Sequence, residues 1–88
     1  MDKNAFQARL QREGYEVEAK GLPANEHRAE HAHHFDVEAL VTGGRITITC
    51  EGKASTYGVG DSFTMKAGAM HIEQVGPEGV EYIVGRRH

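Results

Sequence analysis

The first dozen residues predict a short amphipathic helix. In NAFQARLQREG, Phe6 and Leu10 are spaced to lie one helical turn apart on the same face. Asn4 is placed to cap the N-terminus, with Gln7 three residues later as in a capping box. Gly14 is suited to end the helix in the left-handed conformation. Because the apolar stripe is narrow, we expect the helix to dock on a larger structure.

From residue 15 onward the apolar positions alternate with polar ones, which is typical of β-strands. The alternation is clearest in YEVEAK, HAHHFDVEALVT and RITITC. Glycines separate these segments, and we interpret Gly43-Gly44 as a turn between two strands. Roughly seven short strands punctuated by glycine predict an all-β sandwich or barrel.

The composition suggests a small core. The chain has 88 residues, of which 39% are hydrophobic, and it has no Trp. A single domain of this length buries a smaller share of its surface than a larger one does. We therefore expect a homodimer, in which a second subunit covers one face.

The composition argues against nucleic acid and against a membrane span. The 10 basic residues are outnumbered by 13 acidic ones, which leaves no broad basic surface for nucleic acid. Arg86 and Arg87 form the one adjacent basic pair, which we interpret as a solvated tail. No segment approaches the roughly 20 apolar residues that a membrane span needs.

The sequence favours a cytoplasmic location. The N-terminal residues lack the apolar centre of a signal peptide. Cys50 is the single cysteine, so no internal disulfide forms. We therefore expect a cytoplasmic protein.

The segment AEHAHHFDVEALVTGG carries the candidate chemistry. Alternate side chains of a strand share a face, so His31 and His33 lie on the face of Phe35 and Val37. That face is apolar, so the two imidazoles should point inward at the end of the core. Transition metals use such pairs. Taken alone, however, an HxH pair is more often two hydrogen-bonded histidines at a solvated strand end.

A third imidazole is available further along the chain. His71 follows a glycine-rich turn and begins HIEQV, where the alternation places His71, Glu73 and Val75 on one face. Glu73 has four interpretations: a fourth ligand, a base beside the metal, a group that binds the polar part of a substrate, or a solvated carboxylate at a strand end.

These residues resemble the two motifs of the cupin superfamily. The first motif, G(X)5HXH(X)3–4E(X)6G, is matched by His31, His33 and Gly44, and the second, G(X)5PXG(X)2H(X)3N, by Gly60, Gly68 and His71. Other motif positions differ. Val37 or Glu38 stands at the glutamate position, and Asn25, Lys66 and Val75 replace the leading glycine, the proline and the asparagine.

The resemblance implies a double-stranded β-helix, the jelly-roll barrel of a small single-domain cupin, over residues 15–88, preceded by the helix over residues 1–14. It also implies one divalent transition metal (Fe, Mn, Ni, Co or Zn) held by His31, His33 and His71. The implied activity is oxygenase- or isomerase-type chemistry on a small polar organic molecule, with Glu73 as the candidate catalytic residue. The alternative is a non-catalytic module that binds or senses a metal or small ligand.

Three further residues are candidates for the site. Glu38 satisfies the looser spacing of the family's glutamate, but strand parity turns it away from the histidines. A surface charge is therefore the better interpretation of Glu38. Tyr57 and Tyr82 are candidates to donate hydroxyl groups into a pocket, although packing is the better interpretation of both.

Overall fold

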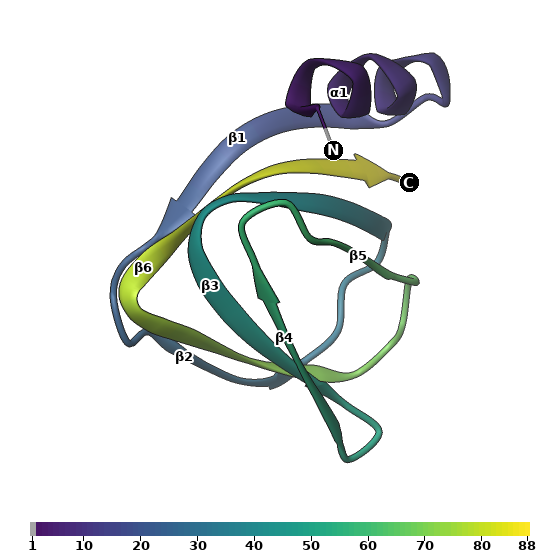
Figure 1. Ribbon diagram of the computed structural model, residues 1–88. Coiled ribbons are helices and arrows are strands. Elements are labelled where there is room, and N and C mark those ends of the chain that lie inside the picture. The colour runs from purple at the N-terminus through teal and green to yellow at the C-terminus, as the bar shows by residue number, and fades with distance from the viewer. Residues whose placement is uncertain (1) are drawn as a thin grey trace.

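The structure is a computed structural model that describes residues 2–88. It consists of one helix and six strands arranged as a curved, rolled sheet (Figure 1). The predicted all-β fold with a short N-terminal helix is confirmed. The elements are α1 (Lys3–Arg12), β1 (Glu16–Leu22), β2 (His27–His31), β3 (Asp36–Cys50), β4 (Lys53–Gly58), β5 (Ser62–Met65) and β6 (His71–Arg87).

Two long antiparallel strands, β3 and β6, organise the sheet. The first part of β3 pairs with β5 and its second part with β4, while β6 pairs first with β2 and then with β1. Each long strand therefore contributes to two layers, and its bend carries the chain from one layer to the other (Figure 1). This arrangement is a jelly roll.

The interpretation of Gly43-Gly44 as a turn is wrong, because β3 runs through both glycines without reversing. The pairing with β6 shifts register on either side of them, which marks β-bulges at the bend. Gly44 has a φ of +68°, and a Cβ there would lie 1.9 Å from the backbone oxygen of Gly79. Two backbones approach so closely at this point that only glycine fits.

The helix begins two residues earlier than its predicted cap implies. Asp2, not Asn4, is the N-cap, and its carboxylate accepts a hydrogen bond from the Asn4 backbone N–H. The predicted C-terminus is confirmed. Gly14 has a φ of +86°. Its backbone N–H donates to the carbonyl of Gln11, and the N–H of Tyr15 donates to the carbonyl of Leu10. These two bonds form a Schellman motif.

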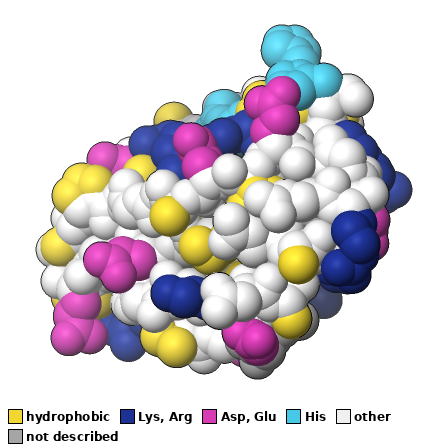
Figure 2. All heavy atoms as spheres, turned by 90° about the horizontal axis from the view of Figure 1, so that it is seen from above, with side chains coloured by type: hydrophobic (Ala, Val, Ile, Leu, Met, Phe, Trp, Pro, Cys, Tyr) yellow, Lys and Arg dark blue, Asp and Glu magenta, His cyan; other side chains and the backbone are white. Residues whose placement is uncertain are grey.

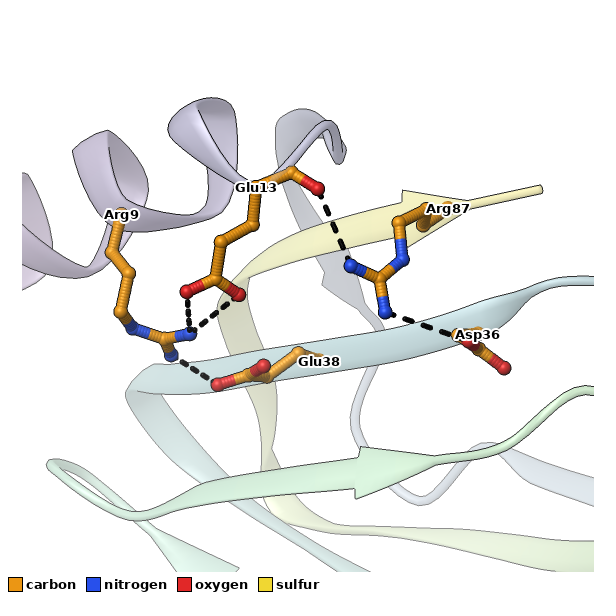
Figure 3. A network of polar contacts seen from close by, with 5 residues as sticks. All are labelled: Arg9, Glu13, Asp36, Glu38 and Arg87. Atoms are coloured by element: carbon orange, nitrogen blue, oxygen red, sulfur yellow. Dashed lines mark hydrogen bonds and ion pairs between the residues drawn. The ribbon is translucent and has the colours of Figure 1, made fainter.

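Helix α1 packs on the outer face of the barrel, near both chain ends (Figure 1). Phe6 and Leu10 are completely covered there and contact Leu40 of β3. Polar contacts frame this apolar seam: Arg9 pairs with Glu13 and Glu38 (Figure 3). The helix thus shares an apolar core with the sheet, as its narrow stripe requires.

Acidic and basic side chains are interspersed on the face of the molecule seen from above in Figure 2. Histidine side chains gather at one edge of that face. Within residues 2–88, no helix has the length and apolar character needed to cross a membrane.

Candidate metal centre

Three histidines and one glutamate converge at one end of the barrel. His31 ends β2, His33 lies in the connection between β2 and β3, and His71 and Glu73 belong to the first part of β6. Each offers a ligand atom, and these atoms all lie within 4.8 Å of one another. His31 and His71 face each other in the pairing of β2 with β6. The tertiary fold thus assembles a group of nitrogen and oxygen donors that suits a transition metal.

The connection between β2 and β3 breaks the single strand that the alternation of residues 31–42 predicts. Residues 32–35 are not in a strand, so His33 is held by a neighbouring turn instead of by sheet pairing. In that turn Gly68 donates a backbone hydrogen bond of 2.8 Å to the carbonyl of His33. The turn leads directly into His71, so this contact joins the segments that carry two of the three imidazoles.

Backbone carbonyls orient two of the imidazole rings. The Nδ1 of His31 lies 2.8 Å from the carbonyl oxygen of Ala29, and the Nδ1 of His71 lies 3.1 Å from that of Ala69. Because a carbonyl oxygen only accepts, each Nδ1 carries the hydrogen. In a neutral ring the Nε2 then presents a lone pair, which is the form that binds a metal.

Both of these Nε2 atoms face the same carboxylate oxygen. Glu73 Oε2 lies 3.0 Å from the Nε2 of His71 and 3.2 Å from the Nε2 of His31. Lone pairs that face one another at such distances repel unless a cation or protons lie between them. A metal ion or a proton at the centre of the cluster therefore satisfies this geometry.

The separations also suit a single metal ion. Nitrogen and oxygen ligands bind first-row ions at about 2.1 Å, so neighbouring ligands lie roughly 3 Å apart around an octahedral ion. The distances from Glu73 to the two imidazoles have this size. The residues present thus fit a divalent transition metal.

The cluster lies partly inside the protein. His71 is 1% exposed and Glu73 8%, while His31 and His33 are half-buried. Burial lowers the pKa of His33 below its usual 6.5, and the neighbouring rings of His71 and His31 lower it further. His33 therefore stays neutral, as a ligand must, under conditions in which a free imidazole starts to take up a proton.

A cavity of ≈ 120 Å³ adjoins the cluster and extends into the barrel. His33 and Glu73 form part of its wall, so an ion held by the cluster would lie at the edge of this space. Tyr82 also lines this cavity. Burial raises the pKa of its hydroxyl, and the charge of Glu73 raises that pKa further. That hydroxyl is therefore neutral and able to donate a hydrogen bond near pH 7.

Two of the residues considered from the sequence lie elsewhere. Glu38 is on the outer face of β3, where it pairs with Arg9 of the helix, so it is not part of the cluster. Tyr57 packs on Phe63, with ring centroids 4.9 Å apart, and does not line the cavity beside the metal cluster. Strand parity accounts for Glu38, because Val37 and Ala39 on either side of it face the barrel interior.

Three cations at the cavity were not recognised as site residues from the sequence. They are Lys20 of β1, Arg28 of β2 and Arg86 of β6. The interpretation of Arg86 and Arg87 as a solvated tail is wrong, since β6 continues to Arg87 and Arg86 is paired with Glu18. Lys20 and Arg86 lie far apart in the sequence, so no local pattern indicated that they share a cavity.

Comparison with solved structures decides the fold. A cupin-2 domain protein from Shewanella frigidimarina superposes with a TM-score of 0.70 at 16% identity, over 84% of this chain and 71% of the other. A cupin superfamily protein from Desulfitobacterium hafniense gives 0.71 at 15% identity, over 83% of this chain and 66% of that one.

The chain has the cupin fold. A cupin 2 conserved barrel protein from Salinispora arenicola agrees, with a TM-score of 0.70 at 20% identity over 84% of this chain and 63% of its own. No protein-family model and no curated protein matches the sequence. The predicted jelly roll is thus confirmed at the level of the fold.

The site departs from the cupin motif in the position of its carboxylate. The motif places the glutamate in the strand that follows HXH, where this chain has Val37, whose side chain is buried in the barrel interior. The carboxylate that reaches the histidines is instead Glu73, two residues after His71 on β6. Its inward position follows from the alternation of His71, Glu73 and Val75, all of which are buried.

Proposed function

We propose that this small cupin binds one divalent transition metal through His31, His33, His71 and Glu73. The observation that carries the proposal is the meeting of two oriented Nε2 atoms on one oxygen of Glu73. A buried carboxylate between two lone pairs is unfavourable without a cation or a proton between them. A metal ion removes this conflict and uses all four groups.

We further propose oxygenase- or isomerase-type chemistry on a small organic molecule. A bound metal supplies a Lewis acid that polarises a substrate oxygen or holds substrate and dioxygen together. Four protein ligands leave two positions open on a six-coordinate ion such as iron, manganese, nickel or cobalt. The cavity beside His33 and Glu73 gives a substrate access to that side of the cluster.

In this proposal the protein groups have separate tasks. Ala29 and Ala69 hold the two rings through their carbonyl oxygens, and Glu73 offsets part of the metal charge. The neutral hydroxyl of Tyr82, at the cavity wall, is a donor for a substrate oxygen. The apolar side chains around the cavity exclude water from the reacting groups.

The alternative is a binding or sensing module without turnover. Four protein ligands saturate a tetrahedral zinc ion, and a closed site of that kind adds stability without catalysis. The identity of the metal therefore separates the two functions. Zinc in the purified protein favours the binding module, whereas iron, manganese, nickel or cobalt favours the enzyme.

The decisive experiment is elemental analysis of untagged protein, with His33→Ala and His34→Ala compared. His34 is exposed beside the cluster and is not part of it, which makes it the matched control. We expect about one metal per chain in the wild type and in His34→Ala, and less than a tenth of that in His33→Ala. Equal, negligible metal in all three proteins would refute the proposal.

Turnover is tested on the loaded protein. Oxygen uptake and product formation are followed with a panel of small acids and phenols, in the wild type and in His33→Ala. Activity that disappears in His33→Ala supports the enzyme. Bound metal without turnover supports the binding module.

We also propose that the chain works as a homodimer. Its apolar core is small, and β1 lies at the end of the sheet order with β6 as its strand partner. Sedimentation at micromolar concentration checks this, and the expected mass is twice the 9.7 kDa of one chain.

A further inference from the structure

The cavity beside the metal cluster combines an apolar floor with a cationic wall. Eight of its lining side chains are apolar, among them Val37, Ile48 and Phe63. Three others are the cations Lys20, Arg28 and Arg86, each from a different strand. Glu73 is the one carboxylate in the lining, and the metal site uses it.

A β-bulge places Arg28 at this wall. Arg28 lies opposite Glu73, and His31 lies opposite His71. Between these two pairs, β2 contains one residue more than β6. Without the bulge, the alternation along β2 would direct Arg28 and His31 to opposite faces. The extra residue therefore brings a guanidinium to the same end of the barrel as the metal ligands.

The two guanidinium groups retain free donors. Among the hydrogen bonds of residues 2–88, Arg28 uses Nε to bind Glu26 at 2.8 Å, and Arg86 uses Nη1 to bind Glu18 at 2.6 Å. Neither acidic partner lines the cavity. Each arginine thus has its ion-pair partner outside the cavity lining and keeps its other N–H groups for a ligand.

Arg86 is further positioned by an aromatic contact. Its guanidinium carbon lies 5.8 Å from the ring centroid of Phe35, which also lines the cavity. Stacking of this kind restricts the side chain before a ligand arrives. Tyr82 adds a hydroxyl donor to the same wall.

We propose that the cavity binds a small organic carboxylate. Arg28, Arg86 and Tyr82 hold the acid group, Lys20 adds positive potential, and the short apolar part of the ligand lies against Val37, Ile48 and Phe63. The volume of ≈ 120 Å³ limits this ligand to a few carbon atoms. The inference rests on the proposed function. When Glu73 binds the metal, its negative charge is neutralised, and the cavity wall carries the positive charges of Lys20, Arg28 and Arg86.

The test uses butyrate and butyramide, which have the same shape but differ in charge. Each is titrated calorimetrically into the metal-loaded chain at moderate salt. We expect butyrate to bind at least tenfold more tightly than butyramide, because charge-assisted hydrogen bonds are the stronger kind. Inorganic sulfate, which has charge but no apolar part, should bind more weakly than butyrate.

Substitutions of Arg28 and Arg86 test whether these two side chains bind the carboxylate. Arg28→Gln and Arg86→Gln should each weaken butyrate binding about tenfold. Arg12→Gln makes the same change at an exposed helix position and should leave the affinity unaltered. Thermal unfolding of each variant verifies that it is folded. Equal binding of butyrate and butyramide, sulfate binding as tight as that of butyrate, or unaltered binding in both cavity variants would overturn the inference.

Metal content is measured on every sample, so that the two proposals fail separately. Metal-loaded protein that shows no preference for the acid overturns the carboxylate site and leaves the metal site standing. If the chain holds no metal, the proposed function fails. The titration of chelator-treated protein then decides the inference, because Arg28 and Arg86 remain in place.

Discussion

Asp36 and Ala67 are joined by a hydrogen bond that spans 31 positions of the sequence: the Ala67 backbone N–H donates to the Asp36 carboxylate at 2.9 Å. Asp36 begins β3 just after the histidine connection, and Ala67 lies in the turn that leads into His71. Asp36 is also reached by Arg87 at 3.9 Å (Figure 3). A residue outside the ligand set thus connects the two segments that bring the imidazoles together.

We predict that Asp36→Ala weakens metal binding although every ligand is retained. Loss of the contact lets the Ala67 turn move relative to His33, and supporting groups of metal sites typically contribute 10- to 100-fold in affinity. Unfolding should also become easier by about 1–2 kcal/mol. Competitive metal titration and urea unfolding measure the two effects.

Asp61→Ala is the matched control for Asp36→Ala. The Asp61 carboxylate accepts a similar backbone hydrogen bond, 2.9 Å from the Gly58 nitrogen, in the turn between β4 and β5. It should lose comparable stability and keep its metal affinity. If both variants lose metal equally, the Asp36 contact has no specific role in the site.

We predict opposite effects of Glu73→Gln on metal-free and metal-loaded protein. A Gln amide donates hydrogen bonds, so it satisfies the Nε2 lone pairs of His31 and His71 that face the carboxylate. The metal-free variant should therefore unfold at the wild-type temperature or above it. The increase in unfolding temperature on metal addition should be much smaller, because an anionic ligand is lost. An undiminished increase would exclude Glu73 as a ligand.

The contribution of His33 to the stability of the metal-free protein should fall as the pH is lowered from 7.5 to 5.5. Burial, with the nearby rings of His71 and His31, lowers the pKa of His33 in the folded protein. Between that pKa and 6.5 the unfolded chain binds more protons than the folded one, so unfolding becomes easier as the pH drops through this range. Urea midpoints across the range measure the effect.

His33→Gln serves as the control for the pH series, because it cannot titrate. Its midpoints should change less between pH 7.5 and 5.5 than those of the wild type, and equal slopes would contradict the assignment to His33. In metal-loaded wild type, occupancy should fall below about pH 6, since a metal binds only deprotonated imidazole.

Gly44→Ala should prevent folding or cost on the order of 4 kcal/mol or more, because its Cβ would lie 1.9 Å from the Gly79 oxygen. Gly52→Ala is the comparison: φ is +77° there, but nothing lies within 4 Å of the added Cβ. Gly52→Ala should lower the free energy of unfolding by roughly 1–2 kcal/mol, the cost of a left-handed backbone conformation for alanine. Urea unfolding separates the two, and similar losses would mean that the close approach is unimportant.

The sequence alone determined the local features. The period of two placed His71, Glu73 and Val75 on one face, because neighbouring side chains of a strand point to opposite sides whatever the sheet contains. Gly14 ended the helix because a left-handed residue there costs glycine little. The three imidazoles and Glu73 were named from such patterns, which reside in a few adjacent residues.

The remaining features depend on which strand lies beside which, so they arise only in the folded protein. The bulge that turns Arg28 toward Glu73 is a mismatch between two strands, and no single segment encodes its position. Gly43-Gly44 bends a strand instead of ending it because β6 pairs with β3 on both sides of the glycines. Arg86 reaches the cavity for the same reason, since its strand is held between β1 and β3.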